Sequence, residues 1–166
     1  MSRPRTVSDE VVVEASPGSL YELLSDPGEM RRWSPENTGA TPASPGPLTV
    51  GASFRGTNRR GPLRWTTECV VTAADPGERF AFRVTRWGVG DRLVRVANAS
   101  WEYRLAALPE GTRVTEIWTD DRPWPDAVAA VVDRVVTGGR TFAEFQRQNI
   151  RTTLDRLKAD VENGDH

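Results

Sequence analysis

The sequence has very little of the residues on which many enzyme mechanisms depend. Its only histidine is His166, the last of 166 residues, and its only cysteine is Cys69. A single histidine at the chain end argues against a Ser-His-Asp triad and against a histidine metal site. One cysteine excludes an intramolecular disulfide and a cysteine metal cluster. The sequence therefore predicts no metal and no other cofactor.

Long apolar runs and a strong charge of one sign are also missing. No stretch approaches the ~20 apolar residues that a membrane-spanning helix needs, and residues 1–6 (MSRPRT) form no apolar signal segment. The net charge is −1, which gives no bulk cationic field to hold nucleic acid or an anionic membrane. We therefore expect a cytoplasmic protein that neither inserts into a membrane nor binds nucleic acid.

What the sequence does contain is enough for one folded domain. Apolar residues make up 37% of the chain and charged residues 27%, a balance that supports a core and argues against disorder. We expect a single domain over residues 1–166. Six tryptophans are many for this length, and the fold has to account for them.

The first third of the chain predicts a strand, two short helices and a loop. Valines alternate with polar residues over 6–15, a period typical of a strand. Ser16-Pro17 and Asp26-Pro27 are helix N-cap signals, and we expect the helices to end near Ser25 and Arg32. Residues 34–51 are rich in proline and glycine and predict a loop with one short edge strand near 36–40.

The middle of the chain predicts an antiparallel meander. Alternating runs are joined by short turns that contain glycine, which is typical of hairpins. The expected strands are 53–59, 64–73, 79–87, one from about 93 or 97 to 106, and 112–119.

The C-terminal segment from about 125 to 161 predicts a long helix. Its apolar residues recur at a spacing near 3.6. Gly138-Gly139 interrupts it, and each glycine costs about 1 kcal/mol relative to alanine inside a helix. Three interpretations stay open: a kink, a division into two helices, or a close approach of another group to the backbone.

Together these elements predict an α+β helix-grip fold. A sheet of six to seven antiparallel strands has one apolar face, and only the long C-terminal helix is available to cover it. If the sheet curves around that helix, the space between them is a cavity.

Several segments carry a family resemblance that extends over nearly the whole chain. They are residues 15–17, 20–27 (LYELLSDP), 30–36 (MRRWSPE), 51–61 (GASFRGTNRRG), 65–71 (WTTECVV), 76–84 (PGERFAFRV), 111–116 (GTRVTE) and 149–158 (NIRTTLDRLK). With them the sequence resembles the START-like superfamily, also called Bet v1-like or SRPBCC proteins, and the polyketide cyclase/dehydrase-like proteins within it. The resemblance implies a hydrophobic ligand in an internal cavity. It leaves the activity open, because members include cyclases, lipid carriers and self-resistance proteins.

Strand alternation also indicates which side chains face that cavity. The arrangement favours a flat, apolar ligand between aromatic walls. A packed core, in which the rings meet only each other, is the alternative. The expected ligand-binding residues are Trp33, Phe54, Trp65, Cys69, Phe82, Trp101, Trp118, Phe142, Gln146 and Asn149.

Three polar residues on the inward faces are candidates for catalysis. Glu116 lies between Val114 and Trp118 on one face of a strand. A carboxylate that faces an apolar cavity must be paired or have a raised pKa, and in the second case it is suited to acid–base work. We expect Asn58 or Tyr103 to assist it. The alternative is a structural ion pair between Glu116 and Arg86, Arg140 or Arg147.

Other candidate features have simpler explanations. Cys69 is better explained as a small buried apolar residue than as a nucleophile. Asp120, Asp121 and Asp126 resemble a metal cluster only by composition. A group of four arginines in ten residues fits either a solvated hairpin or an anionic partner such as an acyl-carrier protein: Arg55, Arg59, Arg60 and Arg64.

Two functions follow from these expectations. In the first, the protein is a polyketide cyclase/dehydrase-like enzyme without metal or nucleotide, in which Glu116 moves protons. In the second, it is a non-catalytic carrier or sequestering protein for a lipid or natural product. We expect a monomer or a weak homodimer. The abundance of arginine over lysine is typical of GC-rich, for example actinobacterial, genomes.

Overall fold

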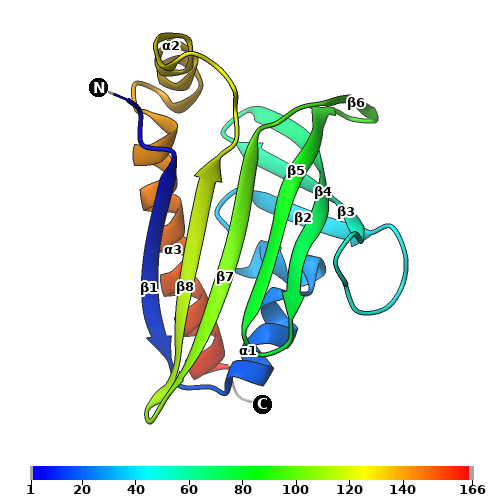
Figure 1. Cartoon of the computed structure of the whole chain (residues 1–166), viewed down its shortest axis with the longest axis vertical. Coiled ribbons are helices and arrows are strands. Elements are labelled where there is room, and N and C mark those ends of the chain that lie inside the picture. Colours follow the sequence, from blue (N-terminus) through cyan, green and yellow to red (C-terminus); the bar gives the residue numbers. More distant parts are fainter. Residues whose placement is uncertain (1, 165–166) are drawn as a thin grey trace.

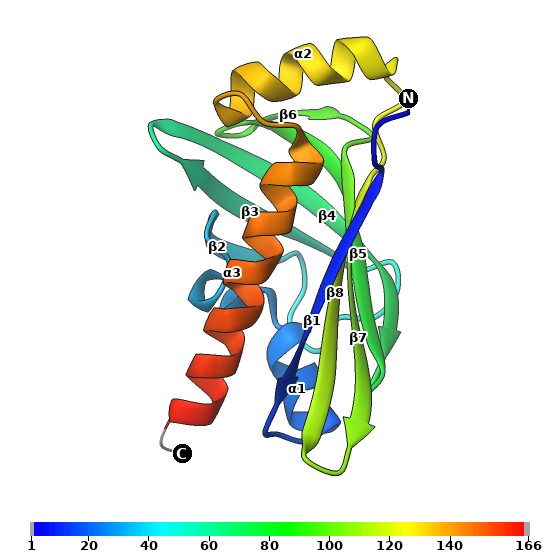
Figure 2. The same cartoon turned by 90° about the vertical axis from the view of Figure 1, so that its left-hand side faces the viewer.

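The computed structural model describes residues 2–164, so His166 lies outside the described residues. Figures 1 and 2 show a curved antiparallel sheet with one long helix lying along its concave side. The elements in chain order are β1 (Thr6–Val13), α1 (Pro17–Leu24), the 3-10 helix η1 (Pro27–Arg32), β2 (Asn37–Pro42), β3 (Ser53–Arg60), β4 (Leu63–Asp75), β5 (Arg79–Val89), β6 (Arg92–Arg95), β7 (Ala99–Leu108), β8 (Gly111–Asp120), α2 (Asp126–Thr137) and α3 (Phe142–Asn163).

The sheet is a meander with the first strand added at its end. Its strand order is β1-β8-β7-β5-β4-β3-β2, and the short β6 pairs with β5. All of these pairs are antiparallel, as the short turns predicted. The chain therefore builds a continuous surface from β1 to β2, along which α3 lies (Figure 2).

Irregular pairing bends this sheet. The register of β4 against β5 shifts between Glu68 and Cys69, and again between Val71 and Ala73. Bulges of this kind increase twist and bend a strand. The helix α3 buries Ile150, Leu154 and Leu157 completely, and they join one core cluster with β1, β8 and α1. The apolar core therefore lies at the end of the molecule near α1. Farther from α1, the bent strands and α3 leave space between them.

The interruption at Gly138-Gly139 divides the C-terminal segment into two helices. Gly138 has φ 73° and Gly139 has φ 108°, a left-handed conformation that glycine adopts without strain. A Cβ built at either residue would meet no atom within 4 Å, so close approach of another group is not the reason for the glycines. Thr141 is the N-cap of the next helix, α3, and forms a capping box with Glu144.

The predicted α+β helix-grip fold is confirmed, with local differences. The sheet has eight strands where six to seven were predicted. The strand expected from about 93 or 97 to 106 is two strands, because β6 turns back on β5 and the chain then enters β7 after Asn98. The second short helix is a 3-10 helix, and the single long helix is the pair α2 and α3.

Candidate functional site

A cavity of about 660 Å³ lies between the concave face of the sheet and helix α3. Its wall is mainly apolar, and it explains the tryptophan content, because all six tryptophans line it. Every candidate site residue from the sequence also lies on its wall: Trp33, Phe54, Asn58, Trp65, Cys69, Phe82, Trp101, Tyr103, Glu116, Trp118, Phe142, Gln146 and Asn149. Strand alternation identified the nine of these positions that lie on strands, because each strand keeps one face toward α3; Phe142, Gln146 and Asn149 lie on α3 itself, and Trp33 follows η1.

Glu116 is the most deeply buried titratable side chain on this wall within residues 2–164. It lies on β8 opposite Tyr103 of β7 and is 2% exposed. The Tyr103 hydroxyl donates a hydrogen bond of 3.2 Å to Oε1 of Glu116. Within residues 2–164, Oε2 has no hydrogen-bond partner. Burial raises the pKa of Glu116 to about 8, although the hydrogen bond from Tyr103 lowers it.

The ion pair that offered the alternative explanation for Glu116 is not present in the described part of the chain. Arg86 lies 3.7 Å from Glu68, and Arg140 donates to Gln148. Arg147 is exposed on α3. Because the Glu116 carboxyl is buried without a cation, its surroundings favour the neutral, protonated form.

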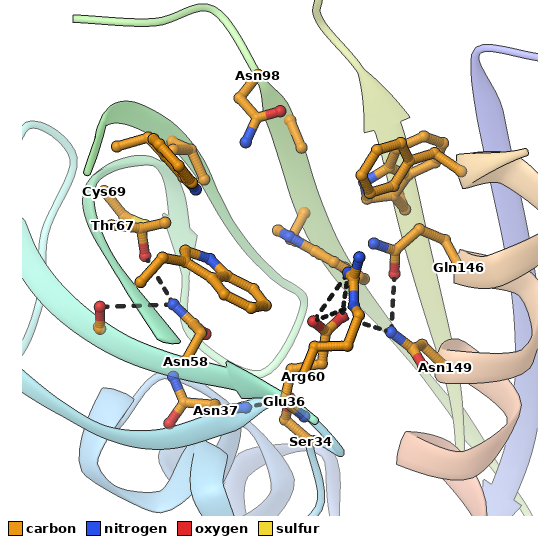
Figure 3. Close-up of a pocket in the computed structure, with 18 of the residues that line it drawn as sticks. Ser34, Glu36, Asn37, Asn58, Arg60, Thr67, Cys69, Asn98, Gln146 and Asn149 are labelled. Atoms are coloured by element: carbon orange, nitrogen blue, oxygen red, sulfur yellow. Dashed lines mark hydrogen bonds and ion pairs between the residues drawn. The ribbon is translucent and has the colours of Figure 1, made fainter. Parts of the chain in front are cut away.

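Asn58 lies on a different part of the wall. Its Nδ2 donates to Oγ1 of Thr67 at 3.3 Å and to the carbonyl of Gly56 at 3.5 Å (Figure 3). Three strands separate β3, which carries Asn58, from β8 in the sheet order. The structure therefore joins Tyr103 to Glu116 but gives Asn58 other partners.

A second polar cluster joins Arg60 and the predicted ligand-binding residue Asn149 through Glu36, which the sequence analysis did not single out. Arg60 forms a two-pronged ion pair with Glu36, with Nε and Nη2 at 3.1 Å and 2.9 Å from Oε2. Asn149 donates to Oε1 of Glu36 at 2.7 Å and contacts Gln146 (Figure 3). The Arg60 guanidinium also lies 4.1 Å from the ring centre of Phe145.

All three residues of this Glu36–Arg60–Asn149 cluster line the cavity. Burial raises the pKa of Glu36, and the neighbouring Arg60 opposes that rise. No local sequence pattern predicts this cluster, because Glu36 falls in a loop and Asn149 lies 113 positions away. Arg60 belongs to the arginine group considered for a solvated hairpin, but its side chain turns inward.

Residues 4–162 match the family model described as polyketide cyclase / dehydrase and lipid transport. The chain belongs to this family. A protein of Mycobacterium tuberculosis, called uncharacterized, is 30% identical over 116 residues, which are 70% of this chain and 64% of that protein. The match thus spans less than two thirds of the relative's length.

Solved structures show the same fold as this member of the cyclase/dehydrase and lipid transport family. A START superfamily protein from Mycobacterium smegmatis superposes with a TM-score of 0.68 at 14% identity, covering 96% of this chain and 99% of that one. A polyketide cyclase-like protein from Corynebacterium glutamicum superposes at 0.59 and 24% identity, covering 100% and 99%. The resemblance to START-like polyketide cyclases is confirmed. With the apolar cavity, it supports binding of a hydrophobic small molecule. In residues 2–164, no helix is long and apolar enough to cross a bilayer.

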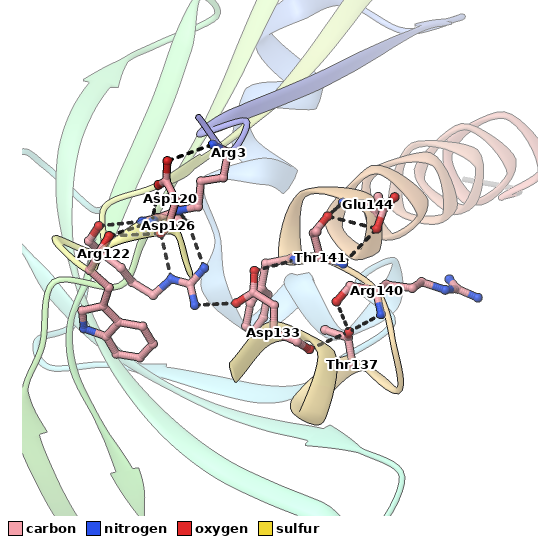
Figure 4. A network of polar contacts seen from close by, with 11 residues as sticks. Arg3, Asp120, Arg122, Asp126, Asp133, Thr137, Arg140, Thr141 and Glu144 are labelled. Carbon is pink, nitrogen blue, oxygen red and sulfur yellow. Dashed lines mark hydrogen bonds and ion pairs between the residues drawn. The ribbon is translucent and has the colours of Figure 1, made fainter. Parts of the chain in front are cut away.

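A buried ionic network lies between the end of β8 and helix α2 (Figure 4). Arg122 is 4% exposed and pairs with Asp120 at 2.8 Å and Asp133 at 2.7 Å. Arg3 pairs with Asp120 and with Asp126, the first residue of α2. These acidic residues have arginine partners, and the described residues contain no group of three or more side chains suited to a metal.

Cys69 is buried in the wall and is not activated. Burial raises the pKa of its thiol to about 12, so the thiol stays protonated at neutral pH. This agrees with its interpretation as a small apolar wall residue.

Proposed function

We propose that the protein binds a flat, aromatic or polyketide-like molecule in its cavity and assists the cyclisation or dehydration of that molecule by proton transfer at Glu116. The observation that carries the proposal is the buried Glu116 carboxyl, bonded to Tyr103 and without a cation, in a wall of aromatic rings.

The size and lining of the cavity favour such a ligand. A volume of about 660 Å³ is in the range of small-molecule sites and leaves room for several fused rings. Trp65, Trp101 and Trp118 offer flat apolar surfaces on which a polycyclic ligand stacks. Gln146 and Asn149 lie on the helix side of the cavity, and we assign them to orienting a ligand carbonyl.

The chemistry assigned to Glu116 is acid–base work on a β-hydroxy or β-keto substrate. With a pKa of about 8 the carboxyl is protonated at neutral pH and gives its proton to a departing hydroxyl, which leaves as water. The resulting carboxylate then takes a proton from the neighbouring carbon, so that the carboxyl is restored and one water is lost. Tyr103 positions the carboxyl, and Asn58 is assigned to orienting the ligand.

A non-catalytic carrier is the second candidate. It is favoured by the polar groups of the wall that already satisfy each other, namely Glu36 with Arg60 and Asn58 with Thr67. Such a wall holds an apolar molecule without acting on it. An acyl-carrier protein as donor of the ligand stays a prediction in either case.

Glu116→Gln separates the two functions. The amide keeps the size of the side chain and loses the proton transfer. If Glu116 is the general acid, dehydration of a β-hydroxy aryl ketone, followed by ultraviolet absorption, falls by at least about 100-fold. The Kd from tryptophan fluorescence changes little. Turnover that persists in Glu116→Gln contradicts the proposal, as does equal loss of turnover and binding. Binding without turnover in the unaltered protein indicates the carrier.

A further inference from the structure

Helix α2 buries a carboxylate and turns an apolar stripe to solvent. Its buried residues are Ala129 and Asp133, whereas Val128, Val131 and Val135 are 51%, 64% and 79% exposed. A surface helix normally turns its valines inward and its charges outward. Val132 and Val136 line the cavity, and the other three valines form an apolar stripe that faces solvent.

The ionic network fixes α2 in this orientation. Asp133 accepts hydrogen bonds from Arg122 at 2.7 Å and from the backbone N–H of Phe142 at 3.0 Å. Both contacts lie on the protein side of the helix (Figure 4). Rotating the valines inward would break these bonds and leave Arg122 buried with one partner fewer, which is costly.

Other exposed apolar side chains lie at the same end of the molecule. Figures 1 and 2 place α2 and the β5–β6 hairpin together at the end opposite α1. The exposed apolar residues of that hairpin, of the β3–β4 turn and of the loop before α2 are Trp87, Val89, Val94, Leu63 and Trp124. Most of them also line the cavity, so the cavity reaches the surface here.

The same end carries arginines in unfavourable pairs. Arg59 lies opposite Arg64 at the tip of β3 and β4, and Arg86 lies opposite Arg95 in the β5–β6 hairpin. Like charges directly opposite each other on neighbouring strands are destabilising. Among residues 2–164, only Arg86 of these four has an acidic partner within 4.0 Å, which is Glu68. An anionic partner at this end would relieve the repulsion.

We propose that this apolar and basic end, formed by α2, the β5–β6 hairpin and the β3–β4 turn, docks on the surface of an anionic lipid bilayer. The valines and tryptophans enter the boundary between headgroups and acyl chains, while the arginines contact lipid phosphates. A hydrophobic ligand then passes between the bilayer and the cavity without crossing water. The net charge of −1 is a sum over the whole chain, so it does not reveal a local group of arginines.

The charge pattern favours a bilayer over a second copy of the chain. A symmetric dimer through this end would bring the two sets of arginines together, and like charges across an interface are costly. An acidic protein would complement the charge of the arginines. It would also need an apolar surface shaped to fit α2, the β5–β6 hairpin and the β3–β4 turn. A fluid bilayer adapts to all of them.

Vesicle flotation tests the proposal. The protein should float with vesicles of phosphatidylcholine and phosphatidylglycerol, should release at high salt, and should not float with phosphatidylcholine alone. The double variant Val131→Asp, Val135→Asp should lower the bound fraction by roughly tenfold. Both valines are exposed, so the fold is retained, as circular dichroism would verify. The matched control is Val50→Asp, since Val50 is 65% exposed and lies in the loop between β2 and β3.

Other outcomes overturn the proposal. These are no flotation with anionic vesicles, equal loss in the Val50→Asp control, binding to an acyl-carrier protein but not to vesicles, or a dimer that the double variant dissociates. Ligand titration without vesicles is a separate measurement, so failure of membrane docking is distinguishable from failure of the proposed function.

Discussion

At the scale of single residues, Glu116 links the folding of the protein to its proposed chemistry. It is 2% exposed, and the only hydrogen bond to its carboxylate in the described residues comes from Tyr103. Because burial disfavours the charged form, the same environment that prepares a proton donor also makes stability depend on pH.

The first residue-scale prediction concerns that pH dependence. The pKa of Glu116 is about 8 in the folded protein, against an ordinary value of 4.5. Between these values the folded state holds a proton that the unfolded state releases, so the contribution to stability is greatest below about pH 4.5 and is lost as pH rises through 8.

Urea unfolding from pH 5 to 9 measures this effect. We expect the free energy of unfolding of the unaltered protein to fall with pH by an amount on the order of a few kcal/mol. Glu116→Gln should fall by much less, and the difference isolates Glu116 from Glu36, whose pKa is also raised. Parallel curves for the two proteins would show that Glu116 is charged in the folded state.

Sequence alone identified many residues of the wall but not their partners. The period of two fixes which side of a strand a residue occupies, so Glu116 and Trp118 were correctly placed toward the helix. The partner of Glu36 is set by how β3 and α3 meet in space, and no local pattern encodes contacts over 24 or 113 positions. The choice between an ion pair and a neutral Glu116 was undecidable for the same reason.

At the scale of elements, the Arg122 network places α2 over the end of the cavity. Arg122 joins β8 to α2, and its guanidinium lies 5.0 Å from the ring centre of Trp124 and 4.8 Å from that of Phe142. The sequence predicted a break at Gly138-Gly139 among three possibilities. It did not predict which face of α2 is buried. Asp133 is buried, and this orientation leaves valines of α2 exposed.

Arg122→Ala tests this arrangement. The substitution leaves Asp120 and Asp133 buried with fewer partners, and we expect a loss of about 3–5 kcal/mol in the free energy of unfolding. Arg151→Ala is the control, because Arg151 forms exposed ion pairs with Asp9 and Asp155 and should cost less than about 1 kcal/mol. Similar losses in the two variants would mean that Arg122 does not anchor α2.

At the scale of the whole molecule, the sheet extends beyond the part of it that packs against the apolar core. α3 packs against β1 and β8, while its link to the far side of the sheet runs through the Glu36–Arg60–Asn149 cluster. The order of elements was enough to predict the helix-grip fold, because only a long helix covers a curved meander. The volume of the cavity between the sheet and α3 depends on the bulges between β4 and β5. The alternation of apolar and polar residues does not reveal these bulges.

The most direct test of the account is a fluorescence titration of the unaltered protein with polycyclic aromatic phenols, linear fatty acids and a sterol. All six tryptophans line the cavity, so a ligand that enters it must change their emission. We predict saturable quenching by the polycyclic phenols and little response to the others. If none of these compounds gives a saturable response, or if fatty acids alone do, the cavity is not a site for flat aromatic molecules and the proposed function is wrong.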